Sequence, residues 1–133
     1  MRVVATIASS GKGSKSSCAV KITAGGFTHT RVVPFTKATV NQAELFALGY
    51  VLASVKPDLD PQFEITTFNT YVGRILERDA LGQYVVTPEK NLEQVKEIRD
   101  LADKKSVIFN VEKTADITAL RELIKKSAEP ANA

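Results

Sequence analysis

The densest set of side chains that could bind a phosphate lies between Ser10 and Ser17, with two lysines and four serines in the order Ser-Gly-Lys-Gly-Ser-Lys-Ser-Ser. A nucleotide-binding phosphate loop needs Gly-Lys-Ser/Thr at the start of a helix whose amides face the phosphates. Here Lys12 is followed by Gly13, and the next residues have the pattern of a strand. We therefore do not expect nucleoside triphosphate binding. Two interpretations stay open: a loop that grips a nucleic-acid backbone, or a plain solvated hairpin loop.

The one cysteine, Cys18, offers no second site of chemistry. It lies in an apolar, strand-like segment and has no histidine near it in the sequence. A lone cysteine cannot form an internal disulfide, which is typical of a reducing compartment. We expect Cys18 to be a core residue, and we expect a cytoplasmic location.

Basic residues are distributed unevenly along the 133-residue chain. Residues 1–40 carry six of the 18 lysines and arginines and none of the 15 acidic residues, so the rest of the chain has 12 basic against 15 acidic residues. This asymmetry predicts a basic face suited to a polyanion, unless folding mixes the charges over the surface. No apolar run is long enough to span a bilayer, and the N-terminus lacks a signal-peptide pattern, so no membrane partner is expected.

Hydrophobic periodicity and turn residues predict nine elements in the order β-β-β-α-β-α-α-β-α. Strands are expected near 2–8, 18–24, 27–35, 63–68 and 107–109, and helices from Thr39, from Asn69, from Thr87-Pro88 to about Asp103, and from Thr114 or Asp116 to Lys126. Gly25-Gly26 suits a two-residue hairpin turn. We predict an α/β fold in one domain, residues 1–133, with a frayed tail at 127–133. Its five-stranded mixed sheet has three antiparallel strands first and helices on both faces.

Four segments resemble the ribonuclease H family, which shares this element order. Residues 39–45 are similar to its helix start around a glutamate, and residues 67–72 to its threonine-aspartate-serine-x-tyrosine-valine motif. Residues 7–11 are similar to its tyrosine-threonine-aspartate-glycine-serine segment, and residues 120–123 to its last helix. The resemblance covers residues 2–127 and implies a ribonuclease H-like fold. It also implies an activity, the cleavage of RNA in RNA–DNA hybrids by two divalent metals held by four carboxylates.

The departures from the family are concentrated at those four carboxylates. The resemblance places Ala8, Phe68 and Arg121 where the family has aspartates, and only Glu44 is retained. Two metal ions need several oxygen ligands, which one carboxylate cannot supply. We therefore expect no catalytic residues, no metal site and no cofactor. Mg²⁺ would matter only for a residual nuclease, in which Asp116 approaches Glu44 and both bind one ion.

The resemblance also implies residues that contact nucleic acid. The loop after the first strand and the asparagine region before the glutamate contact the substrate in the family. Together with the lysines and the replaced site, this gives a predicted nucleic-acid-binding set: Ser9, Ser10, Lys12, Lys15, Asn41, Asn69, Thr70 and Arg121. Simple helix capping is the alternative role for Asn41, Asn69 and Thr70.

Three functions follow from these observations. The first is a non-catalytic ribonuclease H-like domain that binds RNA, an RNA–DNA hybrid or DNA through its basic N-terminal third. The second is a protein-interaction or scaffold module of the same fold, recognised by a contiguous exposed apolar patch and capable of self-association. The third is residual metal-dependent cleavage that requires Glu44.

Overall fold

Residues 1–103 and 105–128 of the chain are described by a computed structural model. Its strands are β1 (Arg2–Lys12), β2 (Lys15–Ala24), β3 (Phe27–Phe35), β4 (Gln62–Thr67) and β5 (Ser106–Val111). Its helices are α1 (Val40–Ala53), the 3-10 turn η1 (Pro57–Leu59), α2 (Thr70–Arg74), α3 (Leu92–Ala102) and α4 (Ala115–Ala128). The predicted element order is confirmed. Residues 129–133 of the expected tail lie outside the described residues, and Ser127 belongs to α4.

The five strands form one mixed sheet in the order β3-β2-β1-β4-β5. β1, β2 and β3 pair antiparallel, whereas β4 pairs parallel to both β1 and β5. Gly25 and Gly26 have φ of 57° and 83°, the conformation that a two-residue hairpin turn between β2 and β3 requires. The mixed sheet with its three antiparallel strands is confirmed.

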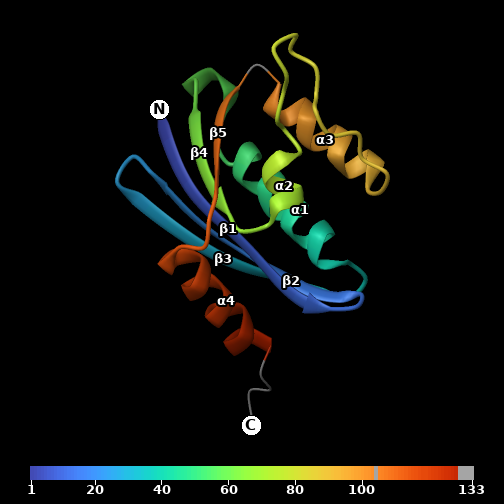
Figure 1. The fold of residues 1–133 in the computed structure, drawn as a ribbon. Coiled ribbons are helices and arrows are strands. Elements are labelled where there is room, and N and C mark those ends of the chain that lie inside the picture. The colour runs from blue at the N-terminus through green and yellow to red at the C-terminus, as the bar shows by residue number, and fades with distance from the viewer. Residues whose placement is uncertain (104, 129–133) are drawn as a thin grey trace.

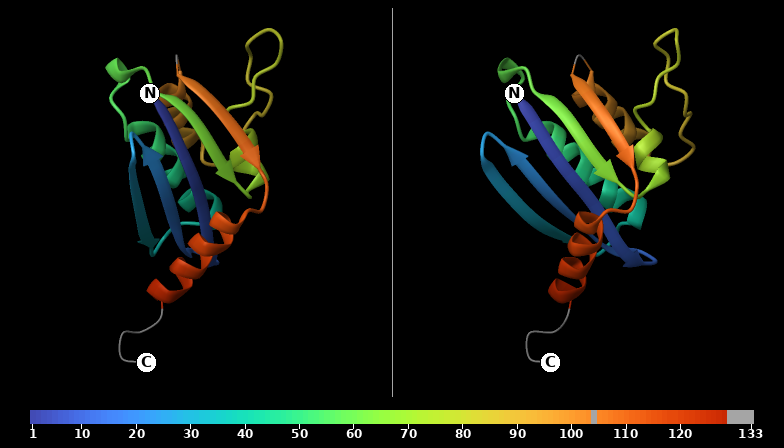
Figure 2. Two further views of the ribbon diagram at one scale, coloured as in Figure 1. Left: turned by 90° about the vertical axis from the view of Figure 1, so that its left-hand side faces the viewer. Right: turned by 60° about the vertical axis from the view of Figure 1, so that its left-hand side comes forward.

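Helices cover both faces of the sheet, as Figures 1 and 2 show. On one face α1 packs against β1 and β2, with α2 and α3 beside it, over the main hydrophobic core. On the other face α4 crosses β1, β2 and β3 and seals a smaller core of five buried residues: Ala8, Ala19, Ile117, Leu120 and Ile124. The second face is thus only partly covered, because α4 reaches the strands on one side of the sheet.

Two predicted helix starts are confirmed by their capping hydrogen bonds. Thr39 and Gln42 form a complete capping box at the start of α1. The Asn69 side chain accepts from the amide of Val72 and caps α2. Thr114 caps α4 in the same way through the amide of Ile117, so Thr114 rather than Asp116 marks the helix start.

Two local predictions are wrong. The Ser9–Ser17 segment is not an open loop: β1 runs on to Lys12 and β2 begins at Lys15, joined by a tight turn in which Gly13 has a φ of 64°. Thr87-Pro88 does not start a helix, because α3 begins at Leu92. The Arg99 guanidinium donates to the carbonyls of Ile75 (3.0 Å) and Val86 (2.8 Å) and so ties the chain before α3 to this helix.

Candidate nucleic-acid interface

The one retained carboxylate, Glu44, is buried beneath the C-terminal ends of β1 and β4. Its Oε1 accepts a hydrogen bond from the Ser9 hydroxyl at 2.6 Å, and its Oε2 accepts from the Thr67 hydroxyl. Glu44, Ser9 and Thr67 are all buried. Both carboxyl oxygens are therefore already engaged inside the protein.

Burial raises the pKa of Glu44 above its usual value. The hydrogen bonds from Ser9 and Thr67 and the nearby Arg121 guanidinium act in the opposite direction but do not cancel the effect of burial. Cys18 lies opposite Ser9 in β2, and burial, followed by the charge of Glu44, raises the pKa of its thiol to about 12. Cys18 is thus a protonated core residue, as predicted from the sequence.

Ser9, not Ala8, is the β1 side chain that meets Glu44. Successive side chains of a strand point to opposite faces of the sheet. Ala8 lies on the α4 face, packed with Ile117 and Leu120, while Ser9 points to the α1 face. Because Ser9 is buried and its hydroxyl donates to Glu44, we remove its side chain from the predicted nucleic-acid contacts.

Phe68 and Arg121 lie together at the end of β4. Phe68 is exposed, and the Arg121 guanidinium carbon is 5.5 Å from the centre of its ring, within the range of a cation–π contact. Arg121 is half-buried, and its Nε is shielded from solvent without a hydrogen-bond partner among the described residues. The two side chains, which the sequence resemblance assigns to two of the family's carboxylate positions, thus form a cation–π contact.

The residues around Glu44 do not fit a pair of divalent ions. Such a pair needs several oxygen ligands, whereas the nearby side chains bring one carboxylate, two hydroxyls, a phenyl ring and a guanidinium. The proposed rescue by Asp116 fails as well, because Asp116 accepts from Lys21 (3.3 Å) on the opposite face of the sheet. In the described part of the chain, no three His, Cys, Asp or Glu residues are grouped to hold a metal ion.

Asn41 and Asn69 lie beside the buried carboxylate. The Asn69 amide nitrogen donates to the Asn41 side-chain oxygen at 2.8 Å, and the Asn69 backbone amide donates to Thr67 at 3.1 Å. Thr70, the first residue of α2, is exposed next to them. Three of the predicted residues are therefore brought together, although Asn69 also caps α2.

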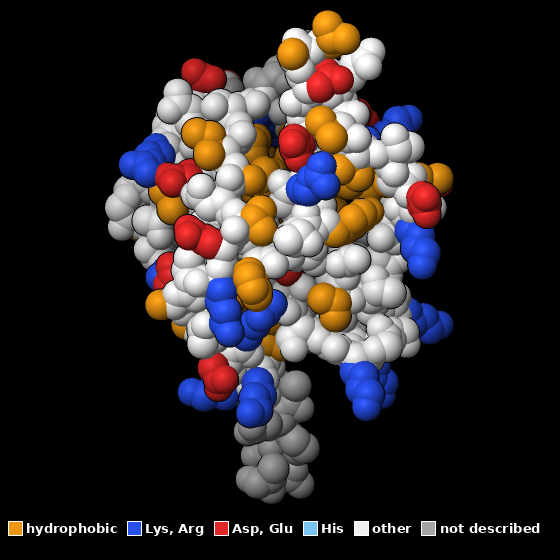
Figure 3. All heavy atoms as spheres, viewed as in Figure 1, with side chains coloured by type: hydrophobic (Ala, Val, Ile, Leu, Met, Phe, Trp, Pro, Cys, Tyr) orange, Lys and Arg blue, Asp and Glu red, His pale blue; other side chains and the backbone are white. Residues whose placement is uncertain are grey.

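Lys12 and Lys15 occupy the tip of the β1–β2 hairpin. They are directly opposite each other in the strand register, and both are exposed. Neither forms an ion pair with any described residue. In Figure 3, lysine and arginine side chains gather over the lower part of the molecule, where Figure 1 places α4 and this hairpin. The N-terminal third thus contributes Lys12 and Lys15 to a basic region that it shares with α4.

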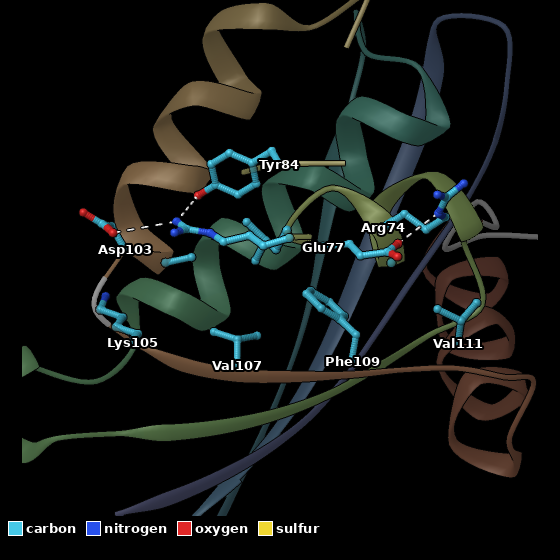
Figure 4. A pocket seen from close by; sticks show the side chains of 12 residues that line it. Arg74, Glu77, Tyr84, Asp103, Lys105, Val107, Phe109 and Val111 are labelled. Carbon is cyan, nitrogen blue, oxygen red and sulfur yellow. Dashed lines mark hydrogen bonds and ion pairs between the residues drawn. The ribbon is translucent and has the colours of Figure 1, made fainter. Parts of the chain in front are cut away.

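Another hollow, of about 650 Å³, lies at the opposite end of the molecule, between β5, α2 and the end of α3 (Figure 4). Val107, Phe109 and Val111 point into it from β5. Its rim is made of ion pairs, Arg74 with Glu77 and Arg78 with Asp103. It contains none of the residues predicted from the sequence to bind nucleic acid.

No sequence profile of a protein family matches this chain, and no curated protein matches it in sequence. Solved structures do match. LC11-RNase H1, isolated from compost and solved in complex with an RNA/DNA hybrid, aligns at a TM-score of 0.69 over 96% of this chain and 99% of its own, with 21% identity. The chain has a ribonuclease H fold.

Two further structures with the ribonuclease H fold support this assignment. The N-terminal RNase H domain of a Mycobacterium tuberculosis protein aligns at a TM-score of 0.75 over 95% of this chain and 98% of its own, with 14% identity. RNase H1 from the halophilic archaeon Halobacterium salinarum aligns at 0.70 over 96% of this chain and 100% of its own, with 21% identity. The fold expected from the sequence resemblance is therefore confirmed. No helix in residues 1–103 and 105–128 has the length and apolar character needed to cross a membrane.

Proposed function

We propose that this chain is a non-catalytic ribonuclease H-fold domain that binds RNA, an RNA–DNA hybrid or DNA. The observation that carries the proposal is the pair Lys12 and Lys15. Like charges directly opposite each other across two strands repel and destabilise the pairing. Two such lysines without an acidic partner are suited to a ligand that brings negative charge, such as a phosphate backbone.

The neighbouring polar residues extend this cationic tip into a continuous surface. Arg121 contacts Phe68, which precedes Asn69, and Asn69 contacts Asn41. Amides and exposed hydroxyls give a protein its register on a nucleic acid, while lysine and arginine supply affinity. The complexes of LC11-RNase H1 with an RNA/DNA hybrid and of foamy viral protease-reverse transcriptase with dsDNA are consistent with such a ligand for this fold.

The non-catalytic part of the proposal rests on the environment of Glu44. Its carboxyl is engaged by Ser9 and Thr67, and the charged side chain that acts on it is the Arg121 guanidinium. No three His, Cys, Asp or Glu residues of the described chain are grouped to hold a metal ion. We therefore infer that the domain holds no catalytic metal and needs no cofactor. We infer that residues 1–133 form one domain. We also infer a cytoplasmic location, because the single cysteine is free and buried.

The protein-interaction alternative has less support. The half of the sheet that α4 leaves open carries Val4 and Ile108, the latter 61% exposed. Glu64 separates these two residues in the strand register and pairs with Arg2 at 2.6 Å. On this part of the sheet an ion pair therefore interrupts the apolar surface.

Binding is tested with a fluorescently labelled RNA–DNA hybrid, an RNA duplex and a DNA duplex over a range of salt concentrations. Wild-type affinity should fall with salt. In the double variant Lys12→Ala/Lys15→Ala this fall should be shallower, with the slope of log K against log salt smaller in magnitude by about 2. The matched control, Lys56→Ala/Lys96→Ala, removes two exposed lysines away from the hairpin. Equal losses in both double variants, or no binding to any duplex at low salt, would overturn the proposal.

Catalysis is tested separately with the labelled hybrid and either Mg²⁺ or Mn²⁺. We expect no cleavage. Metal-dependent cleavage that Glu44→Ala abolishes would overturn the non-catalytic assignment and support the residual nuclease instead. Cleavage that Glu44→Ala leaves unchanged would indicate a contaminating nuclease and would not count against the proposal.

A further inference from the structure

A groove of about 790 Å³ runs between the β1–β2 hairpin and α4. Its polar lining includes Ser10 from β1, three β2 residues (Lys15, Ser16 and Ser17), Thr36 directly after β3, and three α4 residues, Arg121, Glu122 and Lys125. It lies on the face of the sheet opposite to α1, because Ala8, two residues before Ser10 in β1, packs against α4. The groove therefore opens on the α4 face, whereas Glu44 faces α1, and Arg121 is the groove residue whose charge acts on Glu44.

The charge of the groove is strongly one-sided. It brings together three cations, Lys15, Arg121 and Lys125, against one carboxylate, Glu122. None of the four forms an ion pair with a described residue. Cations held close together without partners repel one another, and a bound anion would remove that repulsion.

Arg121 gives a second, independent indication. Its Nε is shielded from solvent yet has no hydrogen-bond partner among the described residues. A buried donor without a partner is unfavourable, because it has lost its hydrogen bonds to water and gained none in the protein. In most proteins such a donor meets an acceptor, and phosphate oxygens, like carboxylate oxygens, form strong charge-assisted hydrogen bonds with a guanidinium.

The lysines at the end of α4 have an ordinary explanation that must be separated from this one. Lysines in the last turn of a helix interact favourably with the helix dipole, which accounts for Lys125 and Lys126 equally. Only Lys125 lines the groove. The two adjacent lysines therefore form a matched pair that distinguishes a ligand site from helix stabilisation.

We propose that this groove binds a backbone phosphate of the nucleic acid without a divalent metal, with Arg121, Lys15 and Lys125 neutralising its charge. The exposed Ser10 and half-exposed Ser17 hydroxyls donate to the phosphate or the adjoining sugar. The inference rests on the proposed function, because it assigns the place where the nucleic-acid backbone is held. The same three cations bind whether or not Mg²⁺ is present.

The test measures hybrid binding by fluorescence anisotropy in EDTA and in Mg²⁺ at constant ionic strength. Arg121→Ala and Lys125→Ala should each weaken binding by about tenfold, the effect of losing one charged hydrogen bond. Arg121→Lys, which keeps the charge, should recover part of the loss, and Glu122→Ala should strengthen binding. Lys126→Ala should change affinity by less than about twofold, and EDTA should have no effect on wild-type affinity.

The outcomes separate this inference from the proposed function. If Lys125→Ala and Lys126→Ala have the same small effect while Lys12→Ala/Lys15→Ala still weakens binding, the groove assignment is wrong and nucleic-acid binding stands. If EDTA abolishes binding, the metal-independent site is wrong. If no duplex binds at all, the proposed function fails, and the groove is then tested with inorganic phosphate by NMR. Shifts at Lys15, Arg121 and Lys125 but not Lys126 would support an anion site, and no shifts would overturn it.

Discussion

The C-terminal end of β1 sends neighbouring side chains into two different environments. Ser9 points under α1, where its hydroxyl meets Glu44 in a closed, buried cluster. Ser10 points to the α4 face and lines an open groove beside Lys15 and Arg121. One side of the sheet therefore buries its carboxylate and satisfies it internally, while the groove on the other side gathers three cations that form no ion pair with a described residue. The polarity of a site depends on which face of a strand its residues occupy, as much as on which residues are present.

The largest effect on stability should come from a carboxylate placed in the core beneath α4, compared with one placed in the neighbouring groove. Ala8 is packed against α4, so Ala8→Asp should destabilise the protein by about 3–5 kcal/mol, as an uncompensated buried charge does. Ser10→Asp, on the same face but exposed, should change stability by less than about 0.5 kcal/mol and weaken duplex binding. Urea unfolding measures both variants. Similar losses in the two would mean that the groove does not begin at Ser10.

A smaller loss is expected when the closed cluster loses a donor. Thr67→Val removes the hydroxyl that donates to Glu44 and accepts from the Asn69 amide. It should cost about 1–3 kcal/mol in free energy of unfolding, because buried groups lose their partners. Thr66, the neighbouring residue on the other face of β4, is only half-buried. Thr66→Val is therefore the control, and an equal cost there would show that the hydrogen bonds of the cluster do not contribute to stability beyond those of an ordinary strand residue.

The protonation of Glu44 makes the stability of the closed cluster depend on pH. Because burial raises the pKa of Glu44 in the folded state, its carboxyl ionises more readily in the unfolded chain. Stability from this group is greatest below the unfolded pKa of about 4.3 and falls as the pH rises to the folded pKa, by about 1.4 kcal/mol for each unit between the two. Glu44→Gln should remove this fall. The free energy of unfolding of Glu44→Gln minus that of the wild type should therefore increase as the pH rises above about 4. A difference independent of pH would contradict the raised pKa of Glu44.

The smallest effect should separate capping from binding in the two asparagines. Asn69 caps α2, so Asn69→Ala should cost about 1 kcal/mol. Asn41 is exposed in the first turn of α1 and accepts only from Asn69, so Asn41→Ala should change stability by less than about 0.5 kcal/mol. Both should weaken hybrid binding in the anisotropy assay. Unchanged affinity in Asn41→Ala would restrict the interface to the cationic face.

Local signals in the sequence predicted the elements well where one residue type is required. Gly25-Gly26, the Thr39–Gln42 box and the Asn69 cap each appear in the structure as expected. Thr87-Pro88 carries an equally good local signal, but the hydrogen bond from Arg99 to the Val86 carbonyl holds that segment outside the helix. Tertiary contacts of this kind have no counterpart in the local pattern.

The site was harder to predict because β1 is buried on both faces. From Ala5 to Ser9 every residue is buried, so no alternation of polar and apolar residues reveals which ones share a face. An assignment by resemblance placed Ala8 opposite Glu44, whereas Ser9 occupies that place in the structure. Thr67 was missed for a related reason, since its role follows from the register of β4 against β1. The groove was missed because Lys125 lies more than a hundred residues from Lys15 and only the packing of α4 brings them together.

The small core beneath α4 has a consequence for the order in which the protein opens. Five buried residues and the Lys21–Asp116 contact hold this helix, whereas the α1 side has a much larger core. The amides of α4 should therefore exchange with solvent through a local opening, well before those of α1, which exchange only on global unfolding. Because Arg121 and Lys125 leave the groove when α4 detaches, a bound backbone would also slow this opening. Slower hydrogen exchange of the α4 amides would then indicate that the groove is occupied.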